Sequence, residues 1–478
     1  MNKWWSILRE AVSGSKRDFT SGSIGLALFL LAVPMILEMI MESIFGVVDI
    51  FFVAKQGANA VAVVGLTESM LAFVFAISIG LSVSATATVA RRYGEQDLEG
   101  AAHSAAHAIY LGIAVSVLMS IIGLVFAPHF LTALGAEPAV VKLGTTFTRI
   151  MLGCNGAIVF LFLLNAIFRG AGDPSVSMRV LFVANLLNIF LAPCFIFGPD
   201  IFSVLHVNAP AWLVNIWPFP HLGVTGAAVG TTIGRGTGVL LAVFYLIRPG
   251  GRITLHRHHW KLDVPVLTSI IRIAAPAVLQ FAIGTASWSA LVRVVAGFGS
   301  EAIAGYVIGL RVIIFVLLPA VGMSNAASTL VGQNLGAGKP DRAEASVWRA
   351  AYINAVILGT GGLILLLFSR AIVGGFTSEP AVLTYGASAL HIVSYGFLFY
   401  AFGMVLESSF NGAGDTWTPT CLNLFVFWAV EIPLAYLLSY RFGFGPSGVF
   451  WAITIAFSLL AICSAIVFKR GKWKEKVV

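Results

Sequence analysis

The feature that most constrains this chain is a series of long apolar blocks that carry almost no charge. A helix that crosses a bilayer needs about 20 mostly apolar residues, and blocks of this length recur along the whole sequence. We place twelve helices near residues 24–50, 58–88, 101–126, 144–168, 178–198, 224–247, 266–296, 302–331, 346–369, 383–410, 417–438 and 447–468. The breaks around Gly57 and Gly299 are ambiguous. The pattern predicts an all-α integral membrane protein.

Composition supports this prediction and excludes other classes. The chain is 58% hydrophobic and only 10% charged, whereas a soluble domain is about 25% charged. A soluble enzyme, a disordered chain and a coiled coil are therefore excluded. The four cysteines lie inside apolar blocks without the spacing of a zinc site, which favours reduced cysteines that pack as apolar side chains.

The basic residues predict the orientation of the chain in the membrane. An even number of spans places both termini on one side, and 21 of the 29 Lys and Arg residues fall on that side, among them Arg169. Five fall on the other side. Because cytoplasmic loops are enriched in Lys and Arg, we expect a multi-pass protein of the plasma (inner) membrane with both termini cytoplasmic. The N-terminal segment shows no signal-peptide cleavage pattern, so we expect the first span to be retained.

The two halves of the chain repeat each other at an offset of 242 residues. The segment Arg169–Asp173 recurs as Asn411–Asp415, with Gly-Ala-Gly-Asp in both copies. The same offset pairs Pro34 with Pro276, Gly80 with Gly322 and Gly94 with Gly336. Because each half holds six helices, the halves enter the membrane in the same direction, as a parallel repeat. Two such bundles with a seam between them are typical of a transporter that rocks open to either side.

The repeat predicts two six-helix lobes joined by a linker. We expect an N-lobe in residues 1–247, a cytoplasmic linker in 248–264 and a C-lobe in 265–478. The linker contains a histidine cluster at residues 256, 258 and 259. Such a cluster can bind metal, but only Asp263 frames it in the sequence, so we favour a solvated linker and expect no metal site.

Three acids share one face of the first helix. At about 100° per residue, Glu38, Glu42 and Asp49 fall within about 40° of each other, over about 16 Å of helix. A lipid-facing carboxylate costs several kcal/mol, so the face points to the protein interior or to a water-filled cavity. Burial favours the protonated form of a carboxyl group, which suits a proton or cation site that also attracts a cationic substrate. The alternative is hydrogen bonding between helices that fixes the bundle.

Other polar and helix-bending residues lie in the spans. Pro34, one turn before Glu38, removes a helix hydrogen bond, and we expect it to bend the helix and to couple protonation to bending. Glu407 and Glu431 form a second candidate polar site. Glu68 and Arg311 occupy roughly corresponding places in the repeat, which favours a structural ion pair across the seam.

Together these residues resemble a known family. The twelve helices, the paired Gly-Ala-Gly-Asp loops, the segment Val331–Ala337 and the first-helix run Val48–Val53 are similar to the multidrug and toxic compound extrusion (MATE) transporters, most of all the DinF-like branch. The resemblance covers nearly the whole chain. It implies a V-shaped pair of six-helix lobes and export of cationic, often aromatic, compounds in exchange for H⁺ or Na⁺.

The resemblance also implies residue roles. Asp49 matches the first-helix acid associated with cation coupling in this branch, and Asn188 matches an asparagine on the fifth helix. Ala192 stands where the family run continues to an acid, so Glu38 and Glu42 are expected to complete the coupling site. Other branches place an acid on the seventh helix, where this chain offers Gln280 and Thr285.

We therefore expect a secondary active multidrug antiporter that works by alternating access. Its cargo is expected to be small organic cations or amphipathic drugs, and H⁺ is favoured over Na⁺ because a Na⁺ site needs several oxygens. The alternative is a flippase for lipid-linked oligosaccharides or peptidoglycan precursors, whose phosphates call for Arg and Lys. We find no motif of a membrane enzyme, and expect no cofactor, no nucleic-acid partner and a functional monomer.

Overall fold

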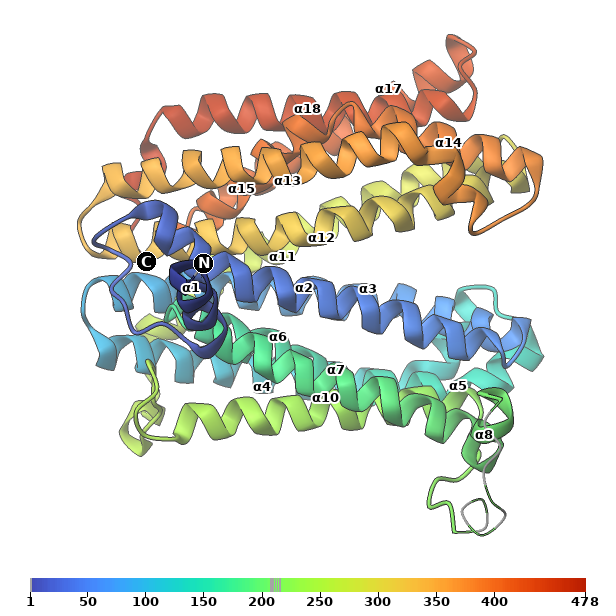
Figure 1. The fold of residues 1–478 in the computed structure, drawn as a ribbon, viewed down its shortest axis with the longest axis horizontal. Helices are drawn as coiled ribbons and strands as arrows, with labels where there is room; N and C mark the ends of the chain where they lie inside the picture. Colours follow the sequence, from blue (N-terminus) through green and yellow to red (C-terminus); the bar gives the residue numbers. More distant parts are fainter. Residues whose placement is uncertain (1, 207–209, 211, 213, 215) are drawn as a thin grey trace.

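The computed structural model describes residues 2–206, 210, 212, 214 and 216–478, and most of them are helical. The long helices run side by side along the longest axis of the molecule (Figure 1). The first half contains α1 (Asn2–Ser13), α2 (Ile24–Ala54), α3 (Ala58–Gly94), α4 (Leu98–Ala133), α5 (Pro138–Gly153), α6 (Gly156–Gly170), α7 (Pro174–Phe197), α8 (Ile201–Val204) and α10 (Val224–Ile247). The second half contains α11 (Val264–Ala296), α12 (Ser300–Gly336), α13 (Pro340–Gly374), α14 (Pro380–Ser394), α15 (Phe397–Gly412), α16 (Trp417–Asn423), the π-helix η3 (Leu424–Glu431), α17 (Ile432–Tyr436), the π-helix η4 (Leu437–Arg441) and α18 (Pro446–Lys469).

The predicted number of spans is confirmed. Eleven helical segments of the described chain are long and apolar enough to cross a membrane, and α14 with α15 makes a twelfth as a pair bent by 63°. The same span of the first half is also interrupted, between α5 and α6. Helix α1 was not predicted. It precedes the first apolar block and exposes Trp4 and Trp5, so a search for long apolar blocks passes over it.

Glycine geometry resolves the two breaks that the sequence left ambiguous. Gly57 and Gly299 precede α3 and α12 with φ of 95° and 104°, a backbone conformation that residues with a Cβ rarely adopt. The two glycines lie 242 residues apart, so both halves turn between their first and second spans by the same device.

The first helix of each half reaches into the apolar core of the other half. The first third of α2 packs with α12, α13, α15 and α18 around Leu31 and Leu330. In return, Ile270 and Ala274 at the start of α11 pack into the core of α3, α4, α6 and α7. The halves are therefore interlocked at this end, and their division into lobes at residues 248–264 stays a proposal about how they move.

Close backbone contacts across the seam come in pairs related by the repeat. A Cβ built on Gly94 would lie 2.0 Å from the carbonyl oxygen of Gln333, and one on Gly336 would lie 2.1 Å from that of Arg91. Gln333 is Arg91 shifted by 242, so the two contacts are equivalent. Gly80 and Gly322 likewise meet α11 and α2 at equivalent positions. The seam thus has the reciprocal character of an interface around a two-fold axis.

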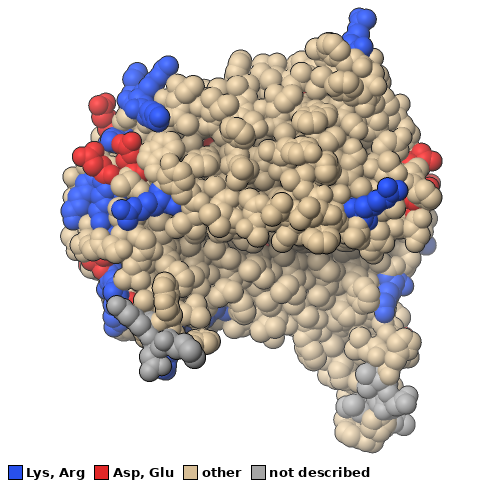
Figure 2. Space-filling view, turned by 45° about the horizontal axis from the view of Figure 1, so that its top comes forward, with Lys and Arg blue, Asp and Glu red and all other residues tan. Residues whose placement is uncertain are grey.

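Gly94 and Gly336 are the last residues of α3 and α12, and these two helices end on the side of the molecule where both termini lie (Figure 1). Toward the opposite end, the core around Val53 holds residues of the first half alone, and the core around Leu291 holds residues of the second half alone. The halves are therefore packed together at the terminus end, here called the closed end, whereas toward the other end each half has an apolar core of its own. On the face that Figure 2 shows, most of the visible Lys and Arg side chains lie at the closed end, fewer lie at the opposite end, and the broad middle is almost free of charge.

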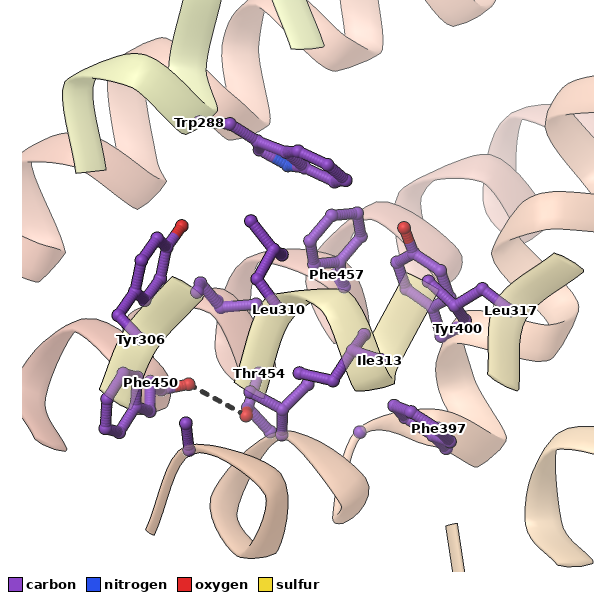
Figure 3. Close-up of a pocket in the computed structure, with 14 residues that line it drawn as sticks. Trp288, Tyr306, Leu310, Ile313, Leu317, Phe397, Tyr400, Phe450, Thr454 and Phe457 are labelled. Carbon is purple, nitrogen blue, oxygen red and sulfur yellow. Dashed lines mark hydrogen bonds between the residues drawn. The ribbon is translucent and has the colours of Figure 1, made fainter. Parts of the chain in front are cut away.

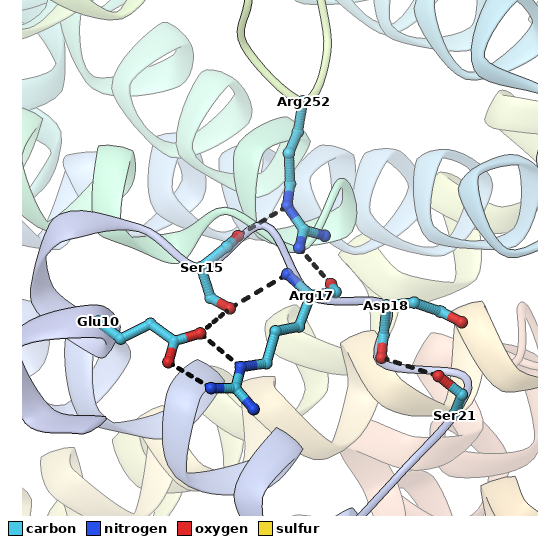
Figure 4. Close-up of polar contacts among 6 residues, drawn as sticks. All are labelled: Glu10, Ser15, Arg17, Asp18, Ser21 and Arg252. Carbon is cyan, nitrogen blue, oxygen red and sulfur yellow. Dashed lines mark hydrogen bonds and ion pairs between the residues drawn. The ribbon is translucent and has the colours of Figure 1, made fainter. Parts of the chain in front are cut away.

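The N-terminal segment ties both halves together at the closed end. Arg252 of the connecting segment donates from Nε to the carbonyl oxygen of Ser15 at 3.1 Å and from a second nitrogen to that of Arg17 (Figure 4). On the other side, Arg342 of α13 donates to the carbonyl oxygens of Phe19, Ser21 and Gly22. The guanidinium groups thus satisfy backbone carbonyls in a segment without helical hydrogen bonds.

Candidate functional site

A cavity of about 500 Å³ lies between the two halves. Helices α2, α3, α6 and α7 line it from the first half, and α11, α12, α15, α16 and α18 line it from the second. Its wall is mainly apolar and aromatic, with Phe162, Phe281, Trp288 and Phe457 among the lining residues. Such a wall with a few polar groups is typical of a small-molecule site.

Glu38 forms a buried ion pair at this cavity. Its Oε1 accepts a hydrogen bond of 2.7 Å from Arg169, and the side chains of Glu38 and Arg169 are only 1% and 11% exposed. The second carboxylate oxygen of Glu38 has no partner among the described residues. The sequence interpretation treated Arg169 as a loop charge that reports orientation. It is instead a buried residue of the last turn of α6, so the pair joins α2 to α6 beside the cavity.

Glu42 joins α2 to two further helices of the first half. Its carboxylate accepts a hydrogen bond of 3.0 Å from Asn185 of α7 and forms an ion pair of 3.2 Å with Arg235 of α10. The Arg235 guanidinium also lies over the rings of Phe45 and Phe75, with its Cζ 5.4 and 5.8 Å from their centroids. Glu42 is therefore both a cavity-lining acid and a fastening point of the helix bundle.

Asp49, the third acid of the face, lacks such partners. Its Oδ1 is buried without a hydrogen bond among the described residues, and the charges that act on it are those of Glu68 and Arg235. Asn188 is buried on α7, and its side-chain nitrogen also has no partner there. No hydrogen bond joins Asp49 and Asn188 in the described chain, so their cooperation in one site stays a prediction.

The polar groups of the cavity break the symmetry of the repeat. Glu38 and Arg169 correspond, at the offset of 242, to Gln280 and Asn411, which face the same cavity. An ion pair in the first half is thus replaced by two neutral amides in the second. At a third position the acid is in the second half instead, since Asn165 of the first half corresponds to Glu407. Both halves therefore present acids to the cavity, and among the described residues Glu38 and Glu42 of the first half form ion pairs with arginine, whereas Glu407 of the second half does not.

The two acids of the second half occupy different places. Glu407 lines the cavity, as does Asn423 of α16. Glu431 is fully buried beyond the cavity wall and accepts a hydrogen bond of 2.7 Å from Ser287 of α11. The predicted second polar site therefore consists of one acid at the cavity and one behind it.

A small apolar chamber of about 40 Å³ adjoins the cavity within the second half (Figure 3). Trp288, Leu317, Tyr400 and Phe457 line both spaces, so the chamber is a side extension of the cavity. Tyr306 closes its far side, with a buried hydroxyl that has no partner among the described residues. The extension is lined mainly by apolar and aromatic side chains.

Two further predictions concern helix α2 and the seam. Pro34 is buried within the continuous helix α2, and its role in bending stays a prediction. Arg311 acts on Glu68 electrostatically, but the ion pairs of 4.0 Å or less in the described chain do not include these two residues.

The sequence predicts no role for Arg235, because a lone arginine in a helix gives no sign of its partner. The equivalence of Arg169 and Asn411 was visible in the sequence and could have drawn attention to both.

Comparison with known proteins agrees with this architecture. The family model described as MatE matches residues 34–194 and 276–437. The chain belongs to the MatE family. The two matches begin 242 residues apart, at Pro34 and Pro276, the same offset that relates the halves. The predicted resemblance is therefore confirmed at the level of the family, and this chain is a MATE-type membrane transporter, not an enzyme.

Named relatives are similar over nearly their whole lengths. A probable multidrug resistance protein YoeA of Bacillus subtilis is 24% identical, covering 95% of this chain and 96% of the relative. The multidrug export protein MepA of Staphylococcus aureus is 24% identical over 94% of each chain. A solved outward-facing conformation of a multidrug resistance MATE family transporter superposes with a TM-score of 0.86, at 23% identity, over 96% of this chain and 98% of that one. The predicted MATE-like fold is therefore confirmed.

Proposed function

We propose that this MATE protein is a secondary active antiporter that exports cationic or amphipathic organic compounds in exchange for H⁺. The observation that carries the proposal is the cavity between the halves, which combines an aromatic wall with acids from both sides, Glu38 and Glu42 from one and Glu407 from the other. Aromatic faces and carboxylates are the groups that attract organic cations. The names of the relatives, which describe multidrug resistance and export, support the same function.

In this proposal Glu38 and Glu42 serve the coupling ion and also attract cationic cargo, whereas Asp49 serves the coupling ion and Glu407 serves the cargo. The coupling site consists of Asp49 and Asn188 with Glu38 and Glu42, all of them in the first half. The cargo meets Glu407, whose Oε1 is buried without a partner among the described residues, beside the amides of Gln280 and Asn411. H⁺ is favoured because Glu38 and Glu42 already hold arginine partners, which leaves few free oxygens for the shell that Na⁺ requires.

We also propose how the protein is oriented in the membrane. The closed end carries both termini and most of the basic side chains, so we place it in the cytoplasm of a cell whose plasma membrane holds the protein. The halves then separate toward the outside, and the conformation is the one from which cargo leaves. One chain supplies both sides of the cavity, so the functional unit is a monomer.

The flippase alternative has less support. A cavity for phosphate-bearing lipids needs free arginine or lysine side chains. Arg169 is the one arginine among the residues that line this cavity, and its charge is engaged by Glu38.

Efflux from proteoliposomes under separately imposed gradients tests the function and the coupling ion. With a fluorescent organic cation as cargo, we expect a pH gradient alone to drive export and a Na⁺ gradient at clamped pH to leave the rate at its background level. Export driven by Na⁺ alone would contradict H⁺ coupling. Absence of export under either gradient would contradict the transport function itself.

Replacing Asp49 with asparagine is expected to abolish coupled export, a reduction of at least about tenfold, because asparagine keeps the size of the side chain but cannot take up a proton. Binding of the cargo, measured by fluorescence polarisation, should change little because Asp49 is absent from the cavity wall. The matched control is Glu301→Gln, an exposed acid in the first turn of α12. Normal coupled export by Asp49→Asn would remove this residue from the mechanism.

A further inference from the structure

The segment that connects the halves is docked on the start of α4. Tyr110 of α4 donates a hydrogen bond of 2.7 Å to the carbonyl oxygen of Trp260, and the two rings meet edge to face. The backbone N–H of Asp263 donates to Nε2 of His107, also on α4, at 2.8 Å. These contacts hold the short helix η2 (Arg257–Trp260) in a fixed place.

This docking brings a carboxylate to two histidines. The Oε2 atom of Glu99, in the first turn of α4, lies 2.8 Å from Nε2 of His258 and 2.6 Å from Nε2 of His259. All three donor atoms lie within 4.8 Å of one another. The sequence could not show this third group, because Glu99 precedes the histidines by about 160 residues. Asp263, which the sequence suggested as the framing acid, is paired with His103 instead, at 3.6 Å.

Two histidine nitrogens and one carboxylate oxygen make a donor set that suits Zn²⁺. Three protein ligands leave a fourth tetrahedral position for water, and the exposure of Glu99 and His258 provides a way in from the solvent. His259 is 3% exposed, so its position is set by the surrounding protein rather than by solvent. The site therefore combines an entry path from the solvent with one ligand held in place by the surrounding protein.

Zn²⁺ binding would change the hydrogen bonds of the His259 ring. Nδ1 of His259 accepts the backbone N–H of His256 at 2.9 Å, so the ring proton sits on Nε2 and points to Glu99. Coordination through Nε2 moves this proton to Nδ1 and opens the hydrogen bond from His256. One neutral hydrogen bond is a small loss beside three metal–ligand bonds.

We propose that Glu99, His258 and His259 form a Zn²⁺ site that fastens the connecting segment to α4. The site lies outside the transport cavity and does not depend on the proposed transport function. Because residues 248–264 join the two halves, the bound metal fixes one end of the only covalent connection between them. His256 lies next to the site but contributes no ligand atom to it.

The test is titration of the purified, detergent-solubilised full chain with ZnCl₂ after chelator treatment and removal of any purification tag. Isothermal titration near neutral pH should show one Zn²⁺ bound per chain, with no comparable binding of Mg²⁺. His258→Ala and Glu99→Gln should each weaken binding by at least about tenfold. His256→Ala is the matched control from the same segment and should bind Zn²⁺ as the natural chain does. Both ligand substitutions are at exposed positions, and a single symmetric peak in size-exclusion chromatography checks that the variants fold.

Proteolysis gives a second readout that does not depend on transport. Arg257 is exposed between the histidines, and Zn²⁺ should slow tryptic cleavage at this residue by at least about threefold in the natural chain and in His256→Ala, but not in His258→Ala. Zn²⁺ binding that is unaffected by His258→Ala and Glu99→Gln would overturn the proposal. Absence of stoichiometric binding to the natural chain would overturn it as well, and would leave the three side chains as a hydrogen-bonded cluster.

Discussion

Transport should fall at least about tenfold when Gly94 and Gly336 are both replaced by alanine. Each added Cβ would lie about 2 Å from a backbone carbonyl oxygen of the opposite half, far inside any real contact distance. Backbone atoms of a long helix cannot move aside as a flexible side chain can, so the two halves must separate at the end where they now meet. Overpacking of this kind costs about 1–3 kcal/mol per site, or about 2–6 kcal/mol for the two sites together, which is enough to shift the balance between two conformations by about 1.5 to 4 orders of magnitude.

The predicted loss of transport is opposite to what helix propensity alone would give, because alanine normally stabilises a helix relative to glycine. In an exposed helix, alanine is favoured over glycine by about 1 kcal/mol, so both substitutions would stabilise the protein if the glycines had no neighbours. Gly65→Ala is the matched control, because Gly65 also lies within α3 and a Cβ there meets nothing within 4 Å. Gly65→Ala should keep full transport and equal or higher stability.

Thiol labelling can show that the halves have separated. In a chain whose native cysteines are replaced, Asn325→Cys places a thiol in the cavity wall. The double alanine variant should allow faster labelling by a membrane-impermeant reagent applied from the terminus side. Unchanged transport and unchanged labelling in the double variant would show that the seam does not constrain the transport cycle at these two glycines.

Arg169→Met should lower the free energy of unfolding by about 3–5 kcal/mol. Removing one partner of a buried ion pair leaves the other charge without compensation in an apolar environment, and Glu38 is only 1% exposed. The double variant Glu38→Gln/Arg169→Met removes both charges and should recover most of this loss, since a neutral pair carries no such penalty. Thermal unfolding of the purified variants in one detergent measures the difference, as a double-mutant cycle.

In the Glu38/Arg169 double-mutant cycle, coupled export should not recover in the double variant, although its stability should. If Glu38 is part of the coupling site, every variant that lacks its carboxyl group should lose coupled export, including the double variant with restored stability. Arg92→Met is the control for the loss of a basic residue, because the Arg92–Glu95 pair is exposed and worth about 0–1 kcal/mol. A double variant with normal stability and normal export would reduce Glu38 and Arg169 to a structural pair.

Most of the fold could be predicted from the sequence because the membrane allows few solutions. In a bilayer, backbone polar groups must be satisfied within the chain, so a long uncharged apolar block can only become a helix. This constraint predicted the number of spans and, through the offset of 242, the equivalence of the halves. It did not predict α1, whose amphipathic character carries no such constraint, nor the breaks inside two of the spans, where local packing decides the angle.

The candidate site could be predicted only in part. Helical periodicity placed Glu38, Glu42 and Asp49 on one face, since positions along one helix are fixed by its geometry. The partners of Glu38 and Glu42 lie on other helices, more than a hundred residues away in the sequence. Arg235 therefore gave no signal, and the signal of Arg169 was only its place in the repeat. Asp49 was expected to join Asn188, and the described chain shows no hydrogen bond between them.

The sequence by itself determined that this protein is a helical membrane protein built from two like halves, because hydropathy and repetition are properties of the chain alone. The tertiary structure decided which charges meet. It paired two acids of α2 with arginines, left Oδ1 of Asp49 without a hydrogen-bond partner among the described residues, and placed Glu99 between two histidines of the connecting segment. The physical reason is that a hydrogen bond or a close ion pair needs about 3 Å between its two heavy atoms, and only the packing of whole helices brings residues that are distant in the sequence that close.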